Sequence, residues 1–273
     1  MPAPTYDLAA AAADYPARNG PPRRTVVICS HPRSGSTLLG EALYMSDLGA
    51  PLEYYHAGFR PTFQARWAAA SLDDYAAAVR RFRTTPSGVH GLKLFWMDVE
   101  DLAHERDPAG QPPRFQRSPK ETSADDYRRL FALIQDLLPN PTFVHLRRQD
   151  RVRQATSHLS AAATGRWRSI DGQDREPAAA PAYDYERIRR IIGAAAYAHA
   201  HWANLFAVLG VAPCPITYEA LARDYEGAVG ALLLRLDAPR RVVRPPRMRQ
   251  QSDPASEAMA LRFVKEDTAR QLG

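Results

Sequence analysis

The sequence predicts an α/β protein with a P-loop-like three-layer fold, in which a mainly parallel sheet carries helices on both faces. Two observations lead to this prediction. Short apolar runs of strand character alternate with longer runs whose apolar residues recur at helical spacing, as in parallel sheets. In addition, the first strand runs into a short polar loop and then into an apolar-periodic helix, an arrangement that suits an anion.

Four apolar runs are predicted to be strands, at residues 25–29, 89–95, 142–146 and 213–218. The predicted helices share apolar residues three or four positions apart, which places those residues on one buried face. They open at residue 37 and after residue 147, and they cover residues 72–82, 125–138, 184–209 and 226–236.

The chain shows no internal repeat and no obvious linker, so residues 25–273 are expected to form a single domain. The preceding residues, 1–24, are rich in Ala and Pro and predict a flexible N-terminal arm. Two Pro-rich stretches, at residues 107–122 and 169–183, are expected to be surface loops.

Composition narrows the function classes. Lys and Arg outnumber Asp and Glu by 36 to 30, which suits an anionic ligand, but no dense basic tail of the nucleic-acid-binding kind is present. No apolar run approaches a membrane span and no signal-peptide core is visible, so a cytoplasmic location is expected. Cys29 and Cys214 lie in apolar runs and are expected to be small buried hydrophobes in a reducing compartment. No metal-binding motif is apparent.

The polar loop after the first strand carries the residue types that hold an anion. Gly35 lets the backbone approach a ligand, Ser34, Ser36 and Thr37 offer hydroxyl groups, and Arg33 adds a permanent planar charge. The helix that follows directs free N–H groups and its positive dipole end into the same concavity. An ordinary strand-to-helix turn needs none of this cluster, so an anion site is the favoured interpretation.

An NTPase P-loop is the main alternative for this loop, and it requires G-x-x-x-x-G-K-[ST]. Here Gly35 directly precedes Ser36 without a Lys, and Ser30 stands where the first Gly would be. No strand of Walker-B type with a terminal Asp is apparent either. A P-loop-like small-molecule kinase is therefore disfavoured, although it stays an alternative.

A second candidate anion site follows the third predicted strand. Arg148 stands at the carboxyl end of that strand, where open α/β sheets bind ligands, and Ser157 lies nine residues on in the next helix. Arg148 alone would suggest a surface salt bridge. Together with the first loop, it favours a ligand that bears two separated phosphate groups.

Several motifs resemble the bacterial trehalose 2-sulfotransferase family. P-R-S-G-S-T-L-L at residues 32–39 resembles its 5′-phosphosulfate loop, and residues 148–157 match its R-x-D-x-x-x-Q-A-x-S element. G-L-K-L-F-W at residues 91–96 is similar to its G-G-K-L-M-W, and the R-Q-Q-S-D that begins at Arg249 is similar to its C-terminal R-Q-A-D. The departures from the family lie in the segments that would touch an acceptor: the region after Tyr55 and the two Pro-rich loops.

This resemblance implies a sulfotransferase that uses 3′-phosphoadenosine-5′-phosphosulfate (PAPS) and a sugar or other small-molecule acceptor, without a metal. It assigns the cofactor to residues 33–37, to Arg148 and Ser157, and to Arg249. A homodimer is also possible by resemblance. The remaining alternative is a nucleotide-binding protein that keeps the cofactor-binding residues but does not catalyse a reaction.

The resemblance also suggests the catalytic residues. Glu53 occupies the position of the family's proposed general base, one residue closer to the loop, and His56 is the second candidate because many other sulfotransferases use His. Arg33, with its permanent planar charge, is also counted among the candidate catalytic residues. Lys93 would either touch the bridging oxygen of the donor or cap the sheet. Aromatic residues at 54, 55, 59, 96 and 167 would offer a sugar-stacking wall, although such residues are more often core.

Overall fold

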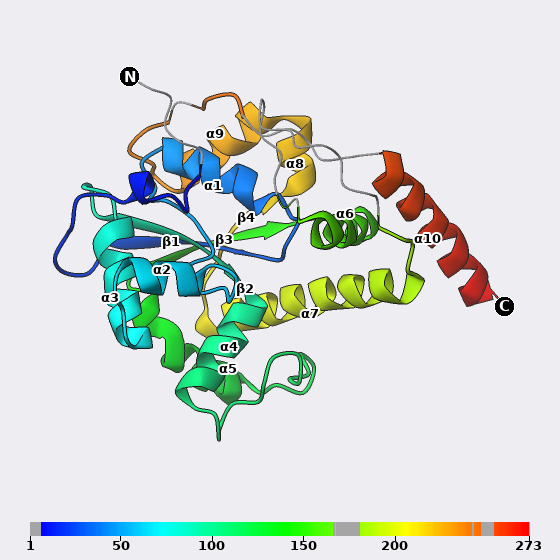
Figure 1. Ribbon diagram of the computed structural model, residues 1–273, viewed down its shortest axis with the longest axis horizontal. Coiled ribbons are helices and arrows are strands. Elements are labelled where there is room, and N and C mark those ends of the chain that lie inside the picture. Colours follow the sequence, from blue (N-terminus) through cyan, green and yellow to red (C-terminus); the bar gives the residue numbers. More distant parts are fainter. Residues whose placement is uncertain (1–6, 166, 168–180, 242, 247–253, 273) are drawn as a thin grey trace.

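The computed structural model describes residues 7–165, 167, 181–241, 243–246 and 254–272. Within them lies a four-stranded sheet of β1 (Arg24–Ser30), β2 (Val89–Phe95), β3 (Pro141–Arg147) and β4 (Cys214–Thr217). The strand order is β2-β1-β3-β4, and every neighbouring pair is parallel (Figure 1). The predicted strands are confirmed, and β1, which carries the first candidate loop, is central.

Alternate side chains of β1 enter two separate cores. Val26 and Ile28 pack with α1 (Ser36–Met45), α8 (Tyr218–Arg223) and α9 (Tyr225–Arg235). Val27 and Cys29 pack on the other face with α3 (Leu72–Arg83), α4 (Trp96–Arg106), α5 (Ala124–Ile134) and α7 (Tyr185–Leu209). Figure 1 shows the two helix layers on opposite sides of the sheet. The period of two in a strand therefore gives the predicted three-layer α/β fold.

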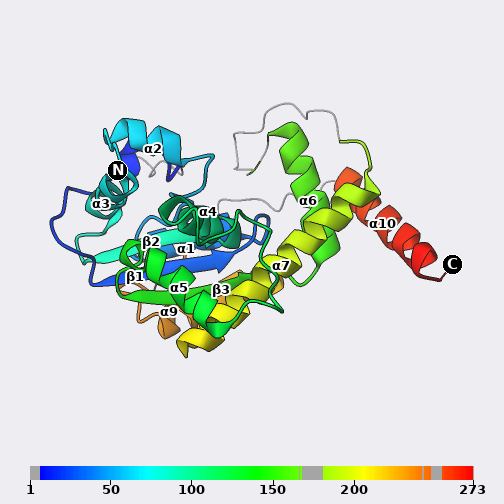
Figure 2. The ribbon, with the colours of Figure 1, turned by 90° about the horizontal axis from the view of Figure 1, so that it is seen from below.

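A smaller third core lies beyond the carboxyl ends of the strands. There α6 (Arg151–Thr164), the beginning of α7 and α10 (Pro254–Leu272) pack together through Leu159, Ile188 and Phe263. Figures 1 and 2 both show these three helices extending past the sheet on one side. This extension places α6 next to the edge of the sheet where the candidate loops lie.

Polar residues at the N-termini explain where several helices begin. The Ser71 hydroxyl accepts the N–H of Asp74, whose carboxylate in turn accepts the N–H of Ser71, and Ser123 with Asp126 repeats this capping box. Asp184 caps α7 by accepting the Arg187 N–H. These caps lie close to the predicted helix starts.

Four helices of the described part of the chain, of 6 to 19 residues, were missed by the sequence prediction. α2 (Arg60–Arg66), α4, α8 and α10 were not expected, and residue 218, predicted as the end of a strand, instead begins α8. α4 and α8 each start at the residue directly after a strand, so no turn residue marks the change of period. The predicted helix 125–138 ends as α5 at Ile134 and continues as a 3₁₀ turn, Gln135–Leu137.

The described part of the N-terminal arm lies against α3. Leu8 is buried, and the fully buried guanidinium of Arg83 donates to the Leu8 carbonyl at 2.6 Å and forms an ion pair with Asp14 at 2.7 Å. Cys29 and Cys214 are free cysteines. The division of the chain into an arm and one domain stays a prediction. In the part of the chain that is described, no helix combines the length and apolarity needed to cross a bilayer.

Candidate active site

The loop between β1 and α1 leaves the first turn of α1 open to an anion. Gly35 is the N-cap residue, with a φ of 85°, and it has no side chain to accept the first N–H groups of the helix. Arg33 also adopts a positive φ, 65°, which costs a residue with a side chain about 1–2 kcal/mol. The loop thus holds an unfavourable backbone conformation at the residue whose charge suits the anion.

Glycine is required at position 35 by a neighbour as well as by its backbone. A Cβ atom at this position would lie 2.8 Å from Cδ2 of Tyr218, the first residue of α8. The ring of Tyr218 therefore closes one side of the loop. The sequence analysis did not single out this residue.

Two hydroxyl groups of this region are buried without a partner among the described residues. Ser30 and Ser34 are fully buried, and neither Oγ atom has a hydrogen-bond partner in the described part of the protein. A buried polar group without a partner costs about 1–3 kcal/mol, so such groups mark a place where a ligand or water is accommodated. The loop residues therefore fit the phosphosulfate group that the sequence predicted for them.

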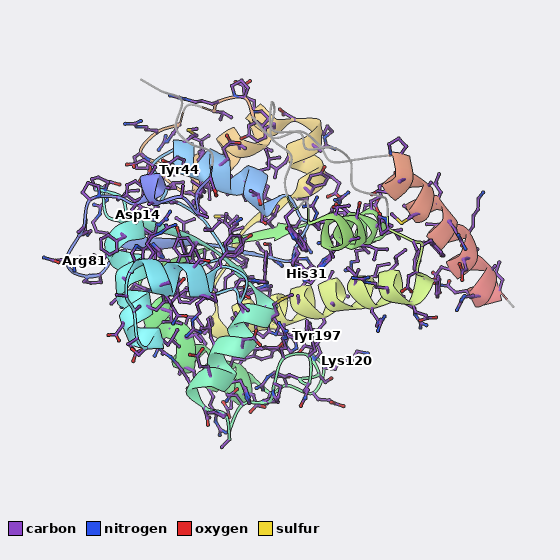
Figure 3. The ribbon with its side chains drawn as sticks, in the orientation of Figure 1. Asp14, His31, Tyr44, Arg81, Lys120 and Tyr197 are labelled. Carbon is purple, nitrogen blue, oxygen red and sulfur yellow. The ribbon has the colours of Figure 1, made fainter. Side chains whose placement is uncertain are left out.

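His31 lies within the same loop as a neutral side chain. Its ring is 6.4 Å from that of His158 on α6, and Figure 3 shows it beyond the end of β1, between α6 and α7. Burial is the main cause that lowers the pKa of His31 to about 3, with His158 and His199 adding to it. His31 is thus not a source of positive charge at neutral pH.

The second candidate site is brought against the first. The Arg33 Nε atom donates to the Ser157 Oγ at 3.0 Å, and Arg148 donates to the carbonyl oxygen of Arg33 at 3.3 Å. The buried Gln154 also donates to the Pro32 carbonyl at 2.8 Å, which fixes the loop to α6. The two predicted sites are therefore neighbours at the carboxyl edge of the sheet.

The guanidinium groups of Arg33 and Arg148 lie near each other at this edge, and both residues are half-buried. Burial, followed by repulsion from Arg148, lowers the pKa of Arg33 to about 10, and burial also lowers the pKa of Arg148. Both groups stay charged at neutral pH. Their repulsion is relieved by an anion placed against them, which is what the arrangement favours.

Arg148 is held by residues that the sequence analysis missed. Its guanidinium lies 4.4 Å from the ring centroid of Tyr218, a cation–π distance. The carboxylate of Glu219 accepts the backbone N–H groups of Gln149 and Asp150, the two residues after Arg148. Their position in the sequence could have revealed them, because residues 218 and 219 are polar and lie at the end of a predicted strand and directly after it. The carboxyl ends of parallel strands lie at the same edge of the sheet as Arg148.

Glu53 and Lys93 form a buried ion pair. Their carboxylate and ammonium groups lie 2.7 Å apart, and the two residues are 8% and 2% exposed. The segment that carries Glu53 runs beside β2, where the Lys93 N–H donates to the Leu52 carbonyl at 2.9 Å. The hydroxyl of Tyr75 also donates to the carbonyl of Tyr54 at 2.6 Å, which ties the segment to α3.

Lys93 connects this ion pair to the anion loop. Its Nζ atom lies 3.4 Å from the Oγ1 of Thr37, in the first turn of α1. Lys93 lies within β2, opposite Ile28 of β1, so the sheet fixes the position of its backbone. A carboxylate, an ammonium group and the N-terminus of α1 therefore meet at one place.

His56 lies three residues beyond Glu53 and is half-buried. Its Nδ1 atom accepts the Gly58 N–H at 3.0 Å, and its ring contacts that of Phe95 edge-on at 6.1 Å. Burial is the largest cause that lowers the pKa of His56, while Glu53 opposes this shift. His56 is therefore neutral at neutral pH and makes its hydrogen bond within its own turn.

Most of the suggested aromatic wall belongs to the core. Tyr54, Tyr55 and Trp96 are buried, which confirms the alternative that such residues pack rather than line a site. Trp167 is 48% exposed, and its carbonyl accepts a hydrogen bond from Arg33. Asp98, just past β2, accepts the N–H of Phe95 at 3.1 Å, and burial raises its pKa to about 8.

Some predicted features fall outside the described residues. Arg249 and most of the loop 169–183 lie there. Within the described residues, no group of three or more His, Cys, Asp and Glu side chains is arranged to hold a metal ion.

A parallel sheet whose central strand β1 runs into a polar loop and a helix N-terminus, with Arg148 directly after the neighbouring strand β3, is typical of proteins that bind anionic ligands. The chain belongs to the Stf0 sulphotransferase family, whose model matches residues 25–266. This family consists of PAPS-dependent enzymes, so the predicted family, enzyme class and donor are confirmed at that level. The kinase alternative loses its support.

Two relatives are named trehalose 2-sulfotransferases. One, from Mycobacterium tuberculosis (strain Erdman), is 28% identical over 270 residues, which cover 89% of this chain and 95% of the relative. The other, from Mycolicibacterium smegmatis, is 27% identical over 194 residues, which cover 71% of this chain and 66% of the relative.

Two solved structures are also similar, each at 15% identity. A sulfotransferase from Alicyclobacillus acidocaldarius matches with a TM-score of 0.45, covering 93% of this chain and 94% of that chain. The sulfotransferase domain from the curacin biosynthetic pathway matches with a TM-score of 0.39, covering 88% of this chain and 77% of that chain.

Proposed function

We propose that this protein transfers the sulfuryl group of PAPS to a hydroxyl group of a carbohydrate or a glycosylated small molecule, and releases adenosine 3′,5′-bisphosphate. The observation that carries the proposal is the buried Glu53–Lys93 pair, which contacts the first turn of the anion-binding helix through Thr37. This pair supplies a proton acceptor and a positive charge next to the loop proposed to hold the donor.

The cofactor grip is proposed to use both anion sites. Arg33 through Thr37 would hold the 5′-phosphosulfate, for which the buried hydroxyl of Ser34 lacks a partner among the described residues. Arg148 and Ser157 would hold the 3′-phosphate, and both contact Arg33. All of these donors belong to the protein, so binding is proposed to need no metal.

When bound, PAPS would supply the sulfuryl group, and the electron pair of the broken S–O bond would remain on the bridging oxygen of the released adenosine 3′,5′-bisphosphate. In the proposed reaction, Glu53 takes the proton of the acceptor hydroxyl as its oxygen bonds to sulfur. Lys93 then faces the negative charge that develops on the bridging oxygen, together with the N–H groups of the first turn of α1. A sulfuryl group carries less charge than a phosphoryl group, and positioning supplies much of the acceleration.

The ion pair has a consequence for the proposed base. The ammonium group of Lys93 lies 2.7 Å from the Glu53 carboxylate and fixes its position beside the first turn of α1. His56 stays the second candidate for the base, since its turn begins at Glu53, whose carbonyl accepts the His56 N–H at 3.1 Å.

The proposed acceptor class rests on the two relatives, both trehalose 2-sulfotransferases. The segments that would touch an acceptor depart from the family pattern, namely the region after Tyr55 and the loops 107–122 and 169–183. We therefore propose a sugar or glycoconjugate and do not restrict it to trehalose. A homodimer stays a prediction based on resemblance.

The test is turnover of PAPS with a panel of hydroxyl-bearing metabolites that includes trehalose, other disaccharides and glycosides. Mass spectrometry would follow an added sulfate on the acceptor and the appearance of adenosine 3′,5′-bisphosphate. The expected result is sulfation of at least one sugar acceptor with PAPS. Phosphorylation of an acceptor with ATP and Mg²⁺, without any sulfation, would overturn the proposal in favour of the kinase alternative.

A further inference from the structure

The turn between β3 and α6 is closed by a carboxylate from a distant part of the chain. The Gln149 N–H lies 3.0 Å from one carboxylate oxygen of Glu219 and 3.1 Å from the other, and the Asp150 N–H lies 3.1 Å from the first. Glu219 belongs to the first turn of α8, 69 residues further along than Asp150. This contact therefore joins β4–α8 to β3–α6 across the site.

The position of this carboxylate is unusual for an anion-binding protein. Consecutive backbone N–H groups in a turn, next to the start of a helix, form a concavity that attracts anions. Here that concavity holds the protein's own Glu219, so a ligand phosphate does not compete for it. The guanidinium of Arg148, which lies next to Arg33, is then the group of this turn that faces the first anion site.

The same turn of α8 controls both anion sites. Tyr218 places its ring 4.4 Å from the Arg148 guanidinium and also leaves no room for a Cβ atom at Gly35. Glu219 holds the two amides that directly follow Arg148. Two adjacent residues thus fix the direction of Arg148: Tyr218 contacts its guanidinium, and Glu219 holds the backbone directly after it.

We propose that Glu219 is a positioning residue for the 3′-phosphate of the cofactor, acting through Arg148. Its carboxylate holds residues 148–150 so that the Arg148 guanidinium stays at the edge of the sheet, next to Arg33. This inference rests on the proposed function, because that proposal assigns the 3′-phosphate to Arg148. It predicts that Glu219 contributes to the discrimination between ligands with and without a 3′-phosphate.

The experiment compares adenosine 3′,5′-bisphosphate with adenosine 5′-phosphate by titration calorimetry. Glu219→Ala removes the acceptor, Glu219→Gln keeps its size with one acceptor oxygen, and Glu226→Ala, an exposed glutamate on α9, is the matched control. For Glu219→Ala the expected loss is about 10- to 100-fold in affinity for the bisphosphate, the range of a charge-assisted hydrogen bond. Affinity for the monophosphate should change by less than about threefold.

Two further measurements separate positioning from general destabilisation. If Glu219 acts through Arg148, the double variant Glu219→Ala/Arg148→Ala should bind the bisphosphate no more weakly than Arg148→Ala alone. Formate, compared with chloride at equal ionic strength, should restore part of the affinity of Glu219→Ala, because a small carboxylate can accept the same two N–H groups. Glu219→Gln, which keeps the shape, should fall between the wild type and Glu219→Ala.

The outcomes are distinguishable. Equal losses for both nucleotides, or fully additive effects in the double variant, would overturn the inference while leaving the proposed function intact. A wild-type protein that does not prefer the bisphosphate would overturn the proposed function and, with it, the assignment of Arg148. If Glu219→Ala does not fold, the same comparison is made with the isosteric Glu219→Gln, where an unchanged preference would contradict the inference.

Discussion

The cofactor side and the acceptor side of this site are built in different ways. On the cofactor side, residues 31–37 form the loop and the start of α1, and hydrogen bonds from Gln154 of α6 and from Arg148, directly after β3, hold two carbonyl groups of this loop. On the acceptor side, the proposed base lies on a segment that runs beside edge strand β2, and one ion pair joins Glu53 to the sheet. Most of the proposed phosphate-binding residues thus belong to one contiguous motif, whereas the acceptor side depends on contacts between distant segments.

This difference separates binding from turnover, because the two sides can be damaged independently. Changes on the acceptor side should slow the reaction while leaving nucleotide affinity intact. Changes on the cofactor side should lower nucleotide affinity, and the loss should grow with the number of hydrogen bonds to phosphate that a substitution removes. The following predictions test this separation, beginning with the largest expected effect.

Replacement of Glu53 should have the largest effect. Glu53→Gln keeps the shape and removes the proton acceptor, so turnover should fall by about 10²–10⁴-fold, the usual range for a general base. Affinity for adenosine 3′,5′-bisphosphate should be nearly unchanged, since the groups that bind phosphate lie on the cofactor side. Steady-state kinetics and calorimetry measure the two quantities.

His56→Ala is the comparison for this variant. An active Glu53→Gln together with an inactive His56→Ala would identify the histidine as the base. Near-normal rates in both variants would mean that positioning alone carries the reaction.

Removal of Lys93 should reduce the stability of the fold. Lys93→Met leaves the buried Glu53 carboxylate without its ion-pair partner, and breaking such a pair costs about 3–5 kcal/mol in free energy of unfolding. The double variant Glu53→Gln/Lys93→Met should recover much of this loss, because no buried charge is left. Chemical denaturation measures both.

The control is an exposed ion pair elsewhere in the molecule. Arg128 and Asp125 lie 2.6 Å apart with side chains 60% and 74% exposed, so Arg128→Ala should cost less than about 1 kcal/mol. If Lys93→Met and Arg128→Ala lowered the free energy of unfolding equally, the buried Glu53–Lys93 pair would be no more important for stability than an exposed ion pair.

Adenosine 3′,5′-bisphosphate should stabilise the fold through the cofactor side alone. At a hundredfold excess over its dissociation constant, it should add about 2.7 kcal/mol to the free energy of unfolding. Because the proposed donors all belong to the protein, the stabilisation should persist in EDTA. Loss of the thermal shift in EDTA would contradict metal-free binding.

Arg148 should contribute part of the affinity for adenosine 3′,5′-bisphosphate. Arg148→Ala is expected to weaken the bisphosphate by about 1.5–3 kcal/mol, the range of a hydrogen bond to a charged group. Its effect on adenosine 5′-phosphosulfate, which lacks the 3′-phosphate, should be small. The neighbouring Arg147, which is exposed, provides the control Arg147→Ala. Equal losses for both ligands would assign Arg148 a structural role.

The sequence by itself determined the layers and the cofactor side. Strand periodicity and helical periodicity are local properties, so the four strands and most of the longer helices were predicted close to their observed bounds, with α10 as the exception. The anion loop and the Arg148–Ser157 element are also local, since each needs only a strand, a turn and a helix in succession. At Trp96 and Tyr218 a helix begins directly after a strand, with no turn residue to mark the change from strand to helical spacing, and the prediction missed both helices.

The tertiary structure alone decided which side chains meet. Glu53 and Lys93 are 40 positions apart in the numbering, and they pair because the segment carrying Glu53 lies along β2. Arg33 meets Ser157, and Glu219 reaches the Asp150 amide, because parallel strands bring their carboxyl ends to one edge of the sheet. Each contact depends on the order of the strands, and that order follows from packing between distant segments, which no local pattern of residues encodes.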